Sequence, residues 1–515
     1  MNWIDLATAP PSDVLQADIC IIGAGAAGIY LALQLASQGK SVVLIEAGPT
    51  SAVNARSVGF MPSFVGDEYA GAITGRYFGL GGTTSRWGGN LVPHTSYDVR
   101  DDVYSSVWGR IASCVKEQSP AVLARFGYTK DAMFEQYAIE KLGSVADVLA
   151  KAGLDVQASL MLPFSQKNLL NLLHQTSRSN CQPRIFYNAV AKDWILSNDG
   201  KRDNSVRNLL AVSRNGNKLS VNADKYILAA GAIESARILL EIDQSTFQQV
   251  LPKDSSPGCF LADHLSLTIA DVALVDLKKA SRLFGPHFEG NWMRGMRFLK
   301  KEINSNSPRA FAHFEFQNES AGFVIAREVL QAVQGHSFPA ITVKSLIAGV
   351  GDLARLGYYR YIKSRLYIPE NTPVNLQLDI EQYPRIENNI SLSDENDEYG
   401  RRKAVIKWKI SSADLGGIEC VTNQFLSLWP GKKAGLPDLI PRELNADSRK
   451  PYDAYHPVGT CRMGENKEAV VDFNLKVHGL GNMWVVSTGV LPSAGTANPT
   501  FTMLCLANKL ATQLG

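Results

Sequence analysis

Three glycines near the start of the chain constrain its fold more than any other feature. Gly23, Gly25 and Gly28 form a G-x-G-x-x-G pattern. The apolar run 18–22 before them is long enough for one buried strand, and apolar residues recur at helical spacing over 29–36 after them. The segment therefore predicts a strand, a tight turn and a helix that starts within the glycine pattern.

A second apolar run, Ser41–Ile45, completes a strand–helix–strand unit, and it ends at Glu46. In such a unit the glycines allow a tight turn, close approach of backbone to a pyrophosphate, and close packing of helix on strand. The helix N-terminus offers free N–H groups to phosphates. Glu46 can accept hydrogen bonds from a ribose and would repel a 2′-phosphate, which disfavours NADP. The unit predicts a dinucleotide site and does not by itself separate FAD from NAD, although its N-terminal position favours FAD. The predicted contacts are Gly23, Gly25, Ala26, Ala27, Gly28, Glu46 and Ala47.

A second glycine cluster lies between residues 71 and 89, where seven glycines occur. Its core, 79–90, reads GLGGTTSRWGGN, a composition unsuited to the interior of a helix or strand. We interpret it as a loop that lies against a large polar and aromatic ligand; a purely structural Ω-loop is the alternative. The candidate ligand contacts are Gly81, Gly82, Thr83, Thr84, Trp87, Gly88, Gly89 and Asn90.

Two polar residues near the C-terminus each precede a proline: His456 before Pro457, and Asn498 before Pro499. A residue before proline is pushed into extended backbone, so both side chains are expected on non-helical segments. Asn498 also fits the N-cap of a terminal helix with Pro499 at its first position, and such a helix start is a site for anions. His456 is the best available proton acceptor for an alcohol near neutral pH.

Composition excludes several classes of protein. The chain has 52 Lys and Arg against 49 Asp and Glu, a net charge of +3, which argues against a nucleic-acid binder. Its hydrophobic content of 45% argues against a largely disordered chain.

No pair of histidines has metal-ligand spacing, so no metal site is predicted. The first basic residue is Lys40, which argues against a signal peptide. The cysteines are odd in number, scattered and without C-x-x-C, which fits a reducing, cytoplasmic location; they are Cys20, Cys114, Cys181, Cys259, Cys420, Cys461 and Cys505.

These motifs occur together, and in this order, in one family. The chain resembles the glucose–methanol–choline (GMC) flavoprotein oxidoreductases over most of its length. The matching segments are 18–48, 79–90, 227–240, 381–393 and 455–507.

The resemblance implies an α/β fold with a bound FAD and oxidation of a substrate alcohol. In the family a C-terminal histidine takes the hydroxyl proton while hydride moves to flavin N5, and His456 falls on that position. A second residue holds the substrate oxygen, and Asn498 falls there. Ala230, Gly231 and Glu234 match a second dinucleotide-contacting segment. Further implied cofactor contacts are Val190, Gly489, Val490, Pro499 and Thr500.

The resemblance also implies two domains. A discontinuous, Rossmann-like FAD-binding domain is expected over 1–98, 180–265 and 450–515. A substrate-binding domain of α+β type, built on an antiparallel sheet, is expected over 99–179 and 266–449.

Two positions depart from the family pattern. In the sugar-oxidising branch near pyranose oxidases, some members attach FAD covalently through a histidine directly before the loop tryptophan. Arg86 stands there, which predicts non-covalent FAD. Ser487 stands where the family usually has an aspartate, so no carboxylate role is expected there. The loop 83–90 itself is similar to that of sugar oxidases, which predicts a sugar or polyol as substrate.

The stretch 345–367 is the least typical of the family. It combines apolar residues with basic residues and tyrosines, and it predicts an amphipathic helix. Such a helix can lie on a membrane surface or a partner protein, or it can be a helix of the substrate domain with a solvated basic face. Two other functions stay open: a non-redox lyase on the same fold, and a flavin subunit that needs a partner protein as electron acceptor. The sequence leaves the electron acceptor and the oligomeric state undetermined.

Overall fold

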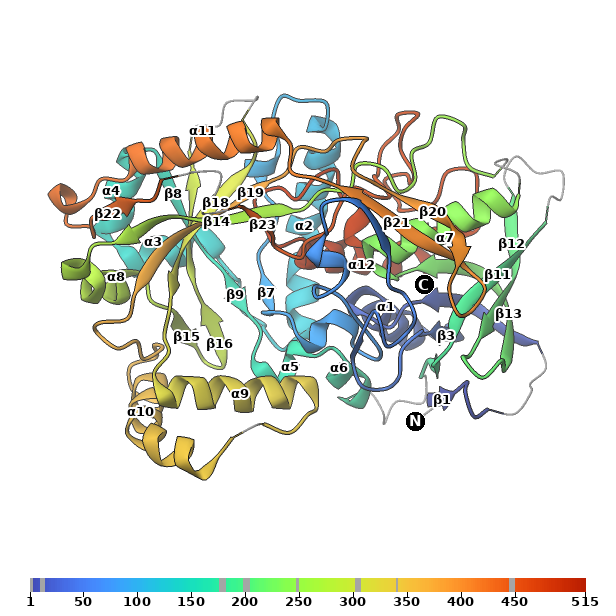
Figure 1. The fold of residues 1–515 in the computed structure, drawn as a ribbon, viewed down its shortest axis with the longest axis horizontal. Coiled ribbons are helices and arrows are strands. Elements are labelled where there is room, and N and C mark those ends of the chain that lie inside the picture. The colour runs from blue at the N-terminus through green and yellow to red at the C-terminus, as the bar shows by residue number, and fades with distance from the viewer. Residues whose placement is uncertain are drawn as a thin grey trace.

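Two large sheets lie side by side along the long axis of the molecule (Figure 1). The computed structural model describes residues 3–9, 14–175, 182–197, 204–246, 250–301, 307–339, 341–443 and 450–515. Cys181 lies outside the described residues; the other six cysteines are free, and four of them are buried.

The first sheet has the parallel core that the sequence predicts. Its order is β1–β10–β3–β2–β13–β12–β11, and β24 pairs in parallel with β13. β12 and β11 form an antiparallel extension at one edge. The core strand β2 is apolar along its second half, since Ile19, Cys20 and Ile21 are fully buried. The strands are β1 (Trp3–Asp5), β2 (Leu15–Ile22), β3 (Val42–Ile45), β10 (Arg184–Tyr187), β11 (Val190–Ser197), β12 (Ser205–Val212), β13 (Lys218–Leu228) and β24 (Met483–Val485).

Helices from both ends of the chain pack beside this sheet. α1 (Ala26–Ser37) follows β2, as predicted, and α12 (Pro499–Leu514) packs against α1 although it lies at the other end of the sequence. α7 (Gly231–Ser245) follows β13 directly. The N-termini of these three helices therefore lie at the carboxyl ends of parallel strands or close to them, the edge at which α/β proteins bind ligands.

The second sheet is antiparallel, in the order β22–β14–β19–β18–β17–β8, with β23 paired to β14. Side chains alternate between its two faces. One face is apolar, and there Phe314 stacks on Phe284 with ring centroids 4.8 Å apart. The other face is polar and carries Ser266 and Asp379, which are directly paired. The strands are β8 (Leu154–Ala158), β14 (His264–Val272), β17 (Met296–Lys300), β18 (Ala310–Phe316), β19 (Val374–Glu381), β22 (Leu439–Pro441) and β23 (Tyr452–Asp453).

Short sheets and further helices complete the fold. The remaining strands are β4 (Val53–Asn54), β5 (Ser63–Gly66), β6 (Tyr77–Phe78), β7 (Asn90–Leu91), β9 (Leu160–Met161), β15 (His287–Glu289), β16 (Trp292–Arg294), β20 (Asn389–Asn396) and β21 (Arg402–Trp408). The remaining helices are α2 (Ser105–Arg125), α3 (Phe134–Leu142), α4 (Ser144–Lys151), α5 (Phe164–Lys167), α6 (Leu170–Gln175), α8 (Leu277–Phe284), α9 (Ala321–Gly335), α10 (Val343–Tyr361) and α11 (Ser412–Leu428). Short 3₁₀ turns occur at η1 (Ala70–Ala72), η2 (Gly82–Ser85), η3 (Ser96–Asp98), η4 (Leu274–Asp276), η5 (Lys432–Ala434) and η6 (Thr488–Val490).

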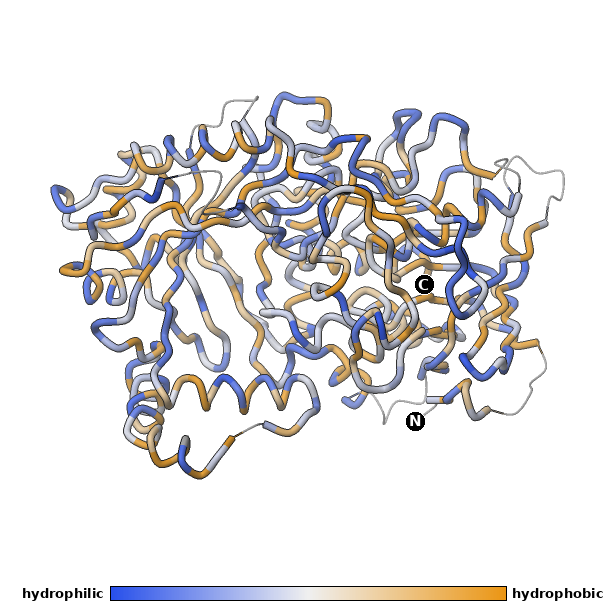
Figure 2. The backbone as a smooth tube through the Cα atoms, in the orientation of Figure 1, coloured by the Kyte–Doolittle hydropathy of each residue, from blue (hydrophilic) through white to orange (hydrophobic). Residues whose placement is uncertain are grey.

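The architecture confirms the predicted fold class: a Rossmann-like α/β unit joined to an α+β unit on an antiparallel sheet. Many hydrophobic residues lie in the strands of both sheets, and the α9–α10 hairpin at the edge of the molecule also contains hydrophobic residues (Figure 2). Among the described residues, no helix combines the length and the hydropathy needed to cross a membrane. The helix expected over 345–367 starts slightly earlier and ends at Tyr361.

Candidate active site

A cavity of about 680 Å³ lies at the carboxyl ends of the parallel strands of the first sheet. Its wall includes Gly23 after β2, Glu46 after β3 and Ala230 after β13. His456 and Asn498, which come from the C-terminal part of the chain, lie on the same wall. The cavity therefore brings both predicted catalytic residues to the predicted dinucleotide-binding edge.

The three glycines of the first motif have three different roles. Gly23 has φ +102°, and a Cβ atom there would lie 2.6 Å from the carbonyl oxygen of Ala229. A Cβ atom at Gly28 would lie 1.8 Å from the carbonyl oxygen of Gly23. Gly25 has no such neighbour within 4 Å; it is the N-cap of α1 and it lines the cavity. The first and third glycines thus make the turn compact, and Gly25 keeps the helix start open to a ligand.

Glu46 joins three segments around the cavity. Its carboxylate accepts backbone N–H groups from Ala24 at 2.7 Å, Gly48 at 2.8 Å and Gly79 at 2.8 Å. Its side chain is buried, and burial raises its pKa while these N–H groups oppose the rise. Glu46, predicted as a ribose contact, lines the cavity. Its hydrogen bonds connect the glycine-rich loop to the first motif.

The second glycine cluster forms a loop against the first motif. A Cβ atom at Gly82, where φ is +52°, would lie 3.1 Å from the Cα atom of Gly25. The loop is fastened from outside the cavity: the Trp87 indole donates to the carbonyl of Lys167 at 2.7 Å, and Thr84 Oγ1 accepts the N–H of Leu169 at 3.0 Å. The loop is therefore an ordered wall of the cavity.

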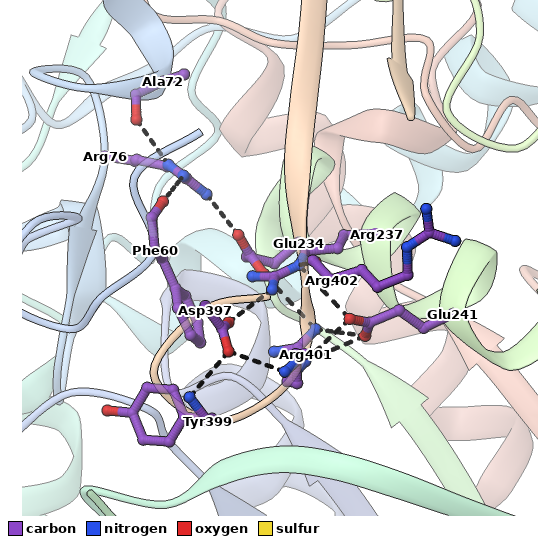
Figure 3. A network of polar contacts seen from close by, with 10 residues as sticks. All are labelled: Phe60, Ala72, Arg76, Glu234, Arg237, Glu241, Asp397, Tyr399, Arg401 and Arg402. Atoms are coloured by element: carbon purple, nitrogen blue, oxygen red, sulfur yellow. Dashed lines mark hydrogen bonds and ion pairs between the residues drawn. The ribbon is translucent and has the colours of Figure 1, made fainter. Parts of the chain in front are cut away.

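Buried arginines near the cavity are neutralised by acidic partners (Figure 3). Glu234, in the first turn of α7, pairs with Arg76 at 3.0 Å and with Arg237 at 3.3 Å. Arg237 also pairs with Asp397 at 2.6 Å, and Arg401 of the same network pairs with Glu241. Although burial opposes it, the arginines hold the pKa of Glu234 below its ordinary value. The predicted contact Glu234 thus lines the cavity as part of a network with three arginines and three acids.

Asn498 occupies the predicted N-cap of α12, with Pro499 at the first position of the helix. Its side chain makes no capping hydrogen bond, which differs from the usual role of an N-cap asparagine. Instead its Nδ2 atom lies 3.4 Å from His456 Nε2. The N-cap position places Asn498 at the cavity and leaves its amide for contacts there.

His456 is held by a second histidine that the motifs did not indicate. His264, the first residue of β14, is fully buried, and its Nε2 atom lies 3.0 Å from the carbonyl oxygen of Gly495. Its Nδ1 atom lies 3.0 Å from His456 Nδ1. Burial lowers the pKa of His264, so this ring is neutral near pH 7.

The tautomers of both rings follow from these contacts. A carbonyl oxygen only accepts, so His264 Nε2 carries the hydrogen and His264 Nδ1 is the acceptor. His456 Nδ1 must then donate to it, which leaves the lone pair of neutral His456 on Nε2. That atom faces Asn498, on the cavity side. Burial, and next the adjacent His264, lower the pKa of His456 to about 3, so its Nε2 is a free proton acceptor near pH 7.

A buried carboxyl group, that of Asp263, holds the backbone of both histidines. It accepts the N–H of His264 at 2.7 Å and the N–H of His456 at 2.8 and 2.9 Å, and it is hydrogen-bonded to the hydroxyl of Tyr69. Burial raises the pKa of Asp263 to about 8. Only the dipeptide Asp263–His264, which directly follows a run of apolar residues, marks this pair in the sequence, and no known spacing singles it out.

Most of the predicted site residues lie on the cavity wall. Gly28, Gly81, Gly489 and Val490 do not line it: Gly28 packs helix on strand, and a Cβ atom at Gly489 would lie 2.5 Å from Thr460 Oγ1 in the layer behind. Further lining residues that the sequence analysis missed include Phe60, Thr74, Tyr77 and Tyr455. The predicted residues that line the cavity are Gly23, Gly25, Ala26, Ala27, Glu46, Ala47, Gly82, Thr83, Thr84, Trp87, Gly88, Gly89, Asn90, Val190, Ala230, Gly231, Glu234, His456, Asn498, Pro499 and Thr500.

The cavity fits an anionic dinucleotide. The N-terminal residues of α1, α7 and α12 all line it, and no side chain caps these three helices by a hydrogen bond. Helix starts offer N–H groups and a positive dipole end to phosphate. Two arginines of the wall, Arg76 and Arg401, are already paired with acids, so the helix N-termini are the main positive groups left for phosphate. Among the described residues, no group of three His, Cys, Asp or Glu side chains could hold a metal ion.

Two family profiles match the chain. Residues 384–507 match the family described as GMC oxidoreductase, and residues 18–137 match that described as FAD dependent oxidoreductase. The second profile contains the glycine motif and the glycine-rich loop; the first contains His456 and Asn498. The matches thus cover the segments that form the cavity wall from both ends of the chain.

The chain is also similar to individual proteins of known activity. An oxygen-dependent choline dehydrogenase of Ectopseudomonas mendocina (strain ymp) is 26% identical over 336 residues, 61% of this chain and 54% of that protein. That of Acinetobacter baumannii (strain AYE) is 41% identical over 61 residues, 12% of this chain and 11% of that protein. The chain thus spans about half or less of these relatives. The crystal structure of pyridoxine 4-oxidase from Mesorbium loti matches with a TM-score of 0.57 and 17% identity, over 96% of this chain and 99% of that one, which shows the shared fold.

Proposed function

Because the chain belongs to the GMC family of FAD-dependent oxidoreductases, we propose that it oxidises the alcohol group of a small substrate to a carbonyl. The observation that carries the proposal is the orientation of His456. Its Nε2 lone pair lies on the cavity side, 3.4 Å from the Asn498 amide, where a substrate hydroxyl can meet both groups.

His456 and Asn498 have different roles at the substrate oxygen. His456 Nε2 accepts the hydroxyl proton, and Asn498 Nδ2 donates a hydrogen bond to the oxygen that loses it. His264 and Asp263 hold the imidazole in place from behind. The N-termini of α1, α7 and α12 would hold FAD, and FAD would supply the hydride acceptor.

We propose that FAD is bound without a covalent link. Arg86 lines the cavity at the position where some family members attach the flavin through histidine, and a guanidinium does not form such a bond. The predicted division into a discontinuous FAD domain and a substrate domain, and a reducing cytoplasmic location, are parts of the same proposal.

We further propose a sugar or another polyol as the substrate class. The support is the loop 83–90, whose Thr83, Thr84 and Asn90 lie on the cavity wall with hydroxyl and amide groups. Such groups suit a ligand with several hydroxyls.

Anaerobic mixing with a panel of alcohols tests the proposal. The panel holds sugars, linear polyols, choline, pyridoxine and aliphatic alcohols, and the reading is bleaching of the flavin absorbance. We expect bleaching by a sugar or polyol and none with the His456→Ala variant at matched FAD content. Bleaching by choline or pyridoxine alone would leave alcohol oxidation standing and remove the sugar assignment. A flavin that no alcohol bleaches contradicts the function.

A further inference from the structure

The helices α9 and α10 form a hairpin that projects at one end of the molecule (Figure 1). Their inner faces pack closely: a Cβ atom at Gly349 would lie 2.5 Å from Ile325 Cδ1 and 3.2 Å from the backbone of Gly322. The two helices are therefore closely packed through these small residues, and the other side of α10, its outer face, faces away from α9.

That outer face is apolar and exposed. Along α10, Val343, Ile347, Val350, Tyr358 and Tyr361 recur on one side, and they are 74%, 72%, 62%, 50% and 79% exposed. The turn between the helices adds Phe338, which is fully exposed. Large exposed apolar side chains that cluster in this way mark an interaction surface, unlike the single ones scattered elsewhere.

The same hairpin is basic. Residues 321–363 hold five Lys and Arg against two Asp and Glu, a net charge of +3, which equals that of the whole chain. The remaining residues therefore sum to zero. Lys344 and Arg355 lie along one flank of the α10 stripe, and Lys363 lies near its end. Arg360 instead donates to the carbonyl of Gly290 at 2.7 Å and packs over Phe288.

We propose that the α9–α10 hairpin docks on the surface of an anionic phospholipid bilayer. An apolar stripe flanked by lysine and arginine is the pattern of helices that lie in the membrane interface, where acyl chains take the apolar side chains and lipid phosphates take the basic ones. Tyrosines suit the same depth because they combine an apolar ring with a polar tip.

The shape of the surface favours lipid over protein. The apolar residues cover the outer side of α10 and the turn at Phe338, so they form a ridge. A ridge enters a fluid interface without a matching groove. A second copy of the chain would bring the same net positive charge to the contact, which disfavours a symmetric pairing of two hairpins.

Docking would take place beside the cavity wall. Gln334, near the end of α9, donates to the carbonyl of Thr84 at 3.0 Å and to that of Trp87 at 2.9 Å. Asn168 Nδ2 donates to the Gln334 carbonyl at 2.9 Å. The hairpin is thus fastened to the loop that lines the cavity, and a membrane under it would lie close to that loop.

Co-sedimentation of the holoprotein with vesicles tests the proposal without any enzyme assay. We expect binding to phosphatidylcholine vesicles that contain phosphatidylglycerol, and little binding to phosphatidylcholine alone. The variants Ile347→Asp and Lys344→Glu/Arg355→Glu should each weaken binding at least about tenfold. The control Val103→Asp changes a valine outside the hairpin that is even more exposed than Ile347, and it should bind like the wild type.

Three results would overturn the proposal. One is that the wild type stays in the supernatant with anionic vesicles. Another is that Ile347→Asp and Val103→Asp bind alike. The third is a dimer by light scattering that Ile347→Asp dissociates, since it would assign the stripe to a second copy of the chain. FAD content and thermal unfolding of each variant show whether it is folded.

Discussion

The Nδ1 atoms of His264 and His456 lie 3.0 Å apart, and only one hydrogen can stand between them. Since the other nitrogen of His264 donates to the Gly495 carbonyl, that hydrogen belongs to His456. A residue of the second sheet thereby decides which nitrogen of His456 is a base. His264 is a positioning residue, because it acts through His456.

Replacement of His264 by Leu should slow flavin reduction about tenfold or more, because the Nδ1 hydrogen of His456 loses its acceptor and the tautomer is no longer fixed. His264→Asn is the matched control: its Oδ1 atom can stand where Nδ1 stood, and it should recover much of the rate. Stopped-flow reduction at equal FAD content measures both. If Leu and Asn variants lose the rate equally, His264 has only a packing role.

Replacement of His456 by Gln should keep the FAD and lower the reduction rate by about 10²–10⁴, the usual worth of a general base. Gln keeps a polar side chain of similar length near Asn498 but cannot take the proton. The absorbance spectrum reports FAD content, and single-turnover mixing reports the rate. A variant that still turns over at the wild-type rate would show that another group is the base.

The pH profile of reduction should lack an acid limb near about 6.5, the ordinary histidine pKa. Burial and His264 lower the pKa of His456 to about 3, so the base stays neutral as pH falls. In His264→Leu one of these causes is gone, and the acid limb should move upward. A wild-type limb centred near the ordinary value contradicts the environment described for His456.

The same shift has a consequence for stability. The unfolded chain protonates His456 at its ordinary pKa, whereas the folded site resists protonation down to about 3. Between pH about 6.5 and about 3 the unfolded state therefore binds more protons than the folded state. The free energy of unfolding should fall as pH drops through this range. Urea unfolding of wild type and His456→Gln at several pH values isolates this contribution, which the variant should lack.

Replacement of Glu46 by Gln should lower the free energy of unfolding by about 1–3 kcal/mol, because one of three buried N–H groups loses its acceptor. The N–H groups belong to Ala24, Gly48 and Gly79, so FAD affinity should fall as well. Thermal unfolding with and without added FAD measures both effects. Asp193→Asn, at an exposed position of β11 in the same sheet, serves as the control for a charge change.

Heat or acid denaturation of the holoprotein should release all of the yellow colour into the supernatant. Arg86 provides no nucleophile for a flavin link. Colour that stays with the precipitate would contradict non-covalent FAD, and mass spectrometry of peptides containing residues 79–90 would then identify the attachment.

Local patterns in the sequence were enough to predict the dinucleotide edge. The glycine pattern at Gly23, Gly25 and Gly28 specifies its own turn and helix within a few residues, and β2 and α1 form there. The pattern of Asn498 followed by Pro499 likewise predicted the start of α12. These features depend on neighbours in sequence, which is why reading along the chain finds them.

His264 could not be predicted from such local patterns. Its partner is 192 residues away, and its role exists only once β14 has paired with β23 and brought His456 beside it. For the same reason the neighbours of Gly489 in sequence do not show which side of its segment faces the ligand: the family resemblance implies a cofactor contact there, and the residue lies one layer behind the cavity wall.

The parallel pairing of β13 with β24 joins Tyr226 to Met483, and α1 rests on α12 at the opposite end of the chain. During synthesis the N-terminal half therefore has an unpaired sheet edge and an uncovered helix until β24 and α12 have left the ribosome. Such late closure exposes apolar surface and an unpaired strand edge for a long time, which favours aggregation of the nascent chain. It also means that a chain cut short before β24 contains His456 but lacks Asn498 and the start of α12, which belong to the cavity wall.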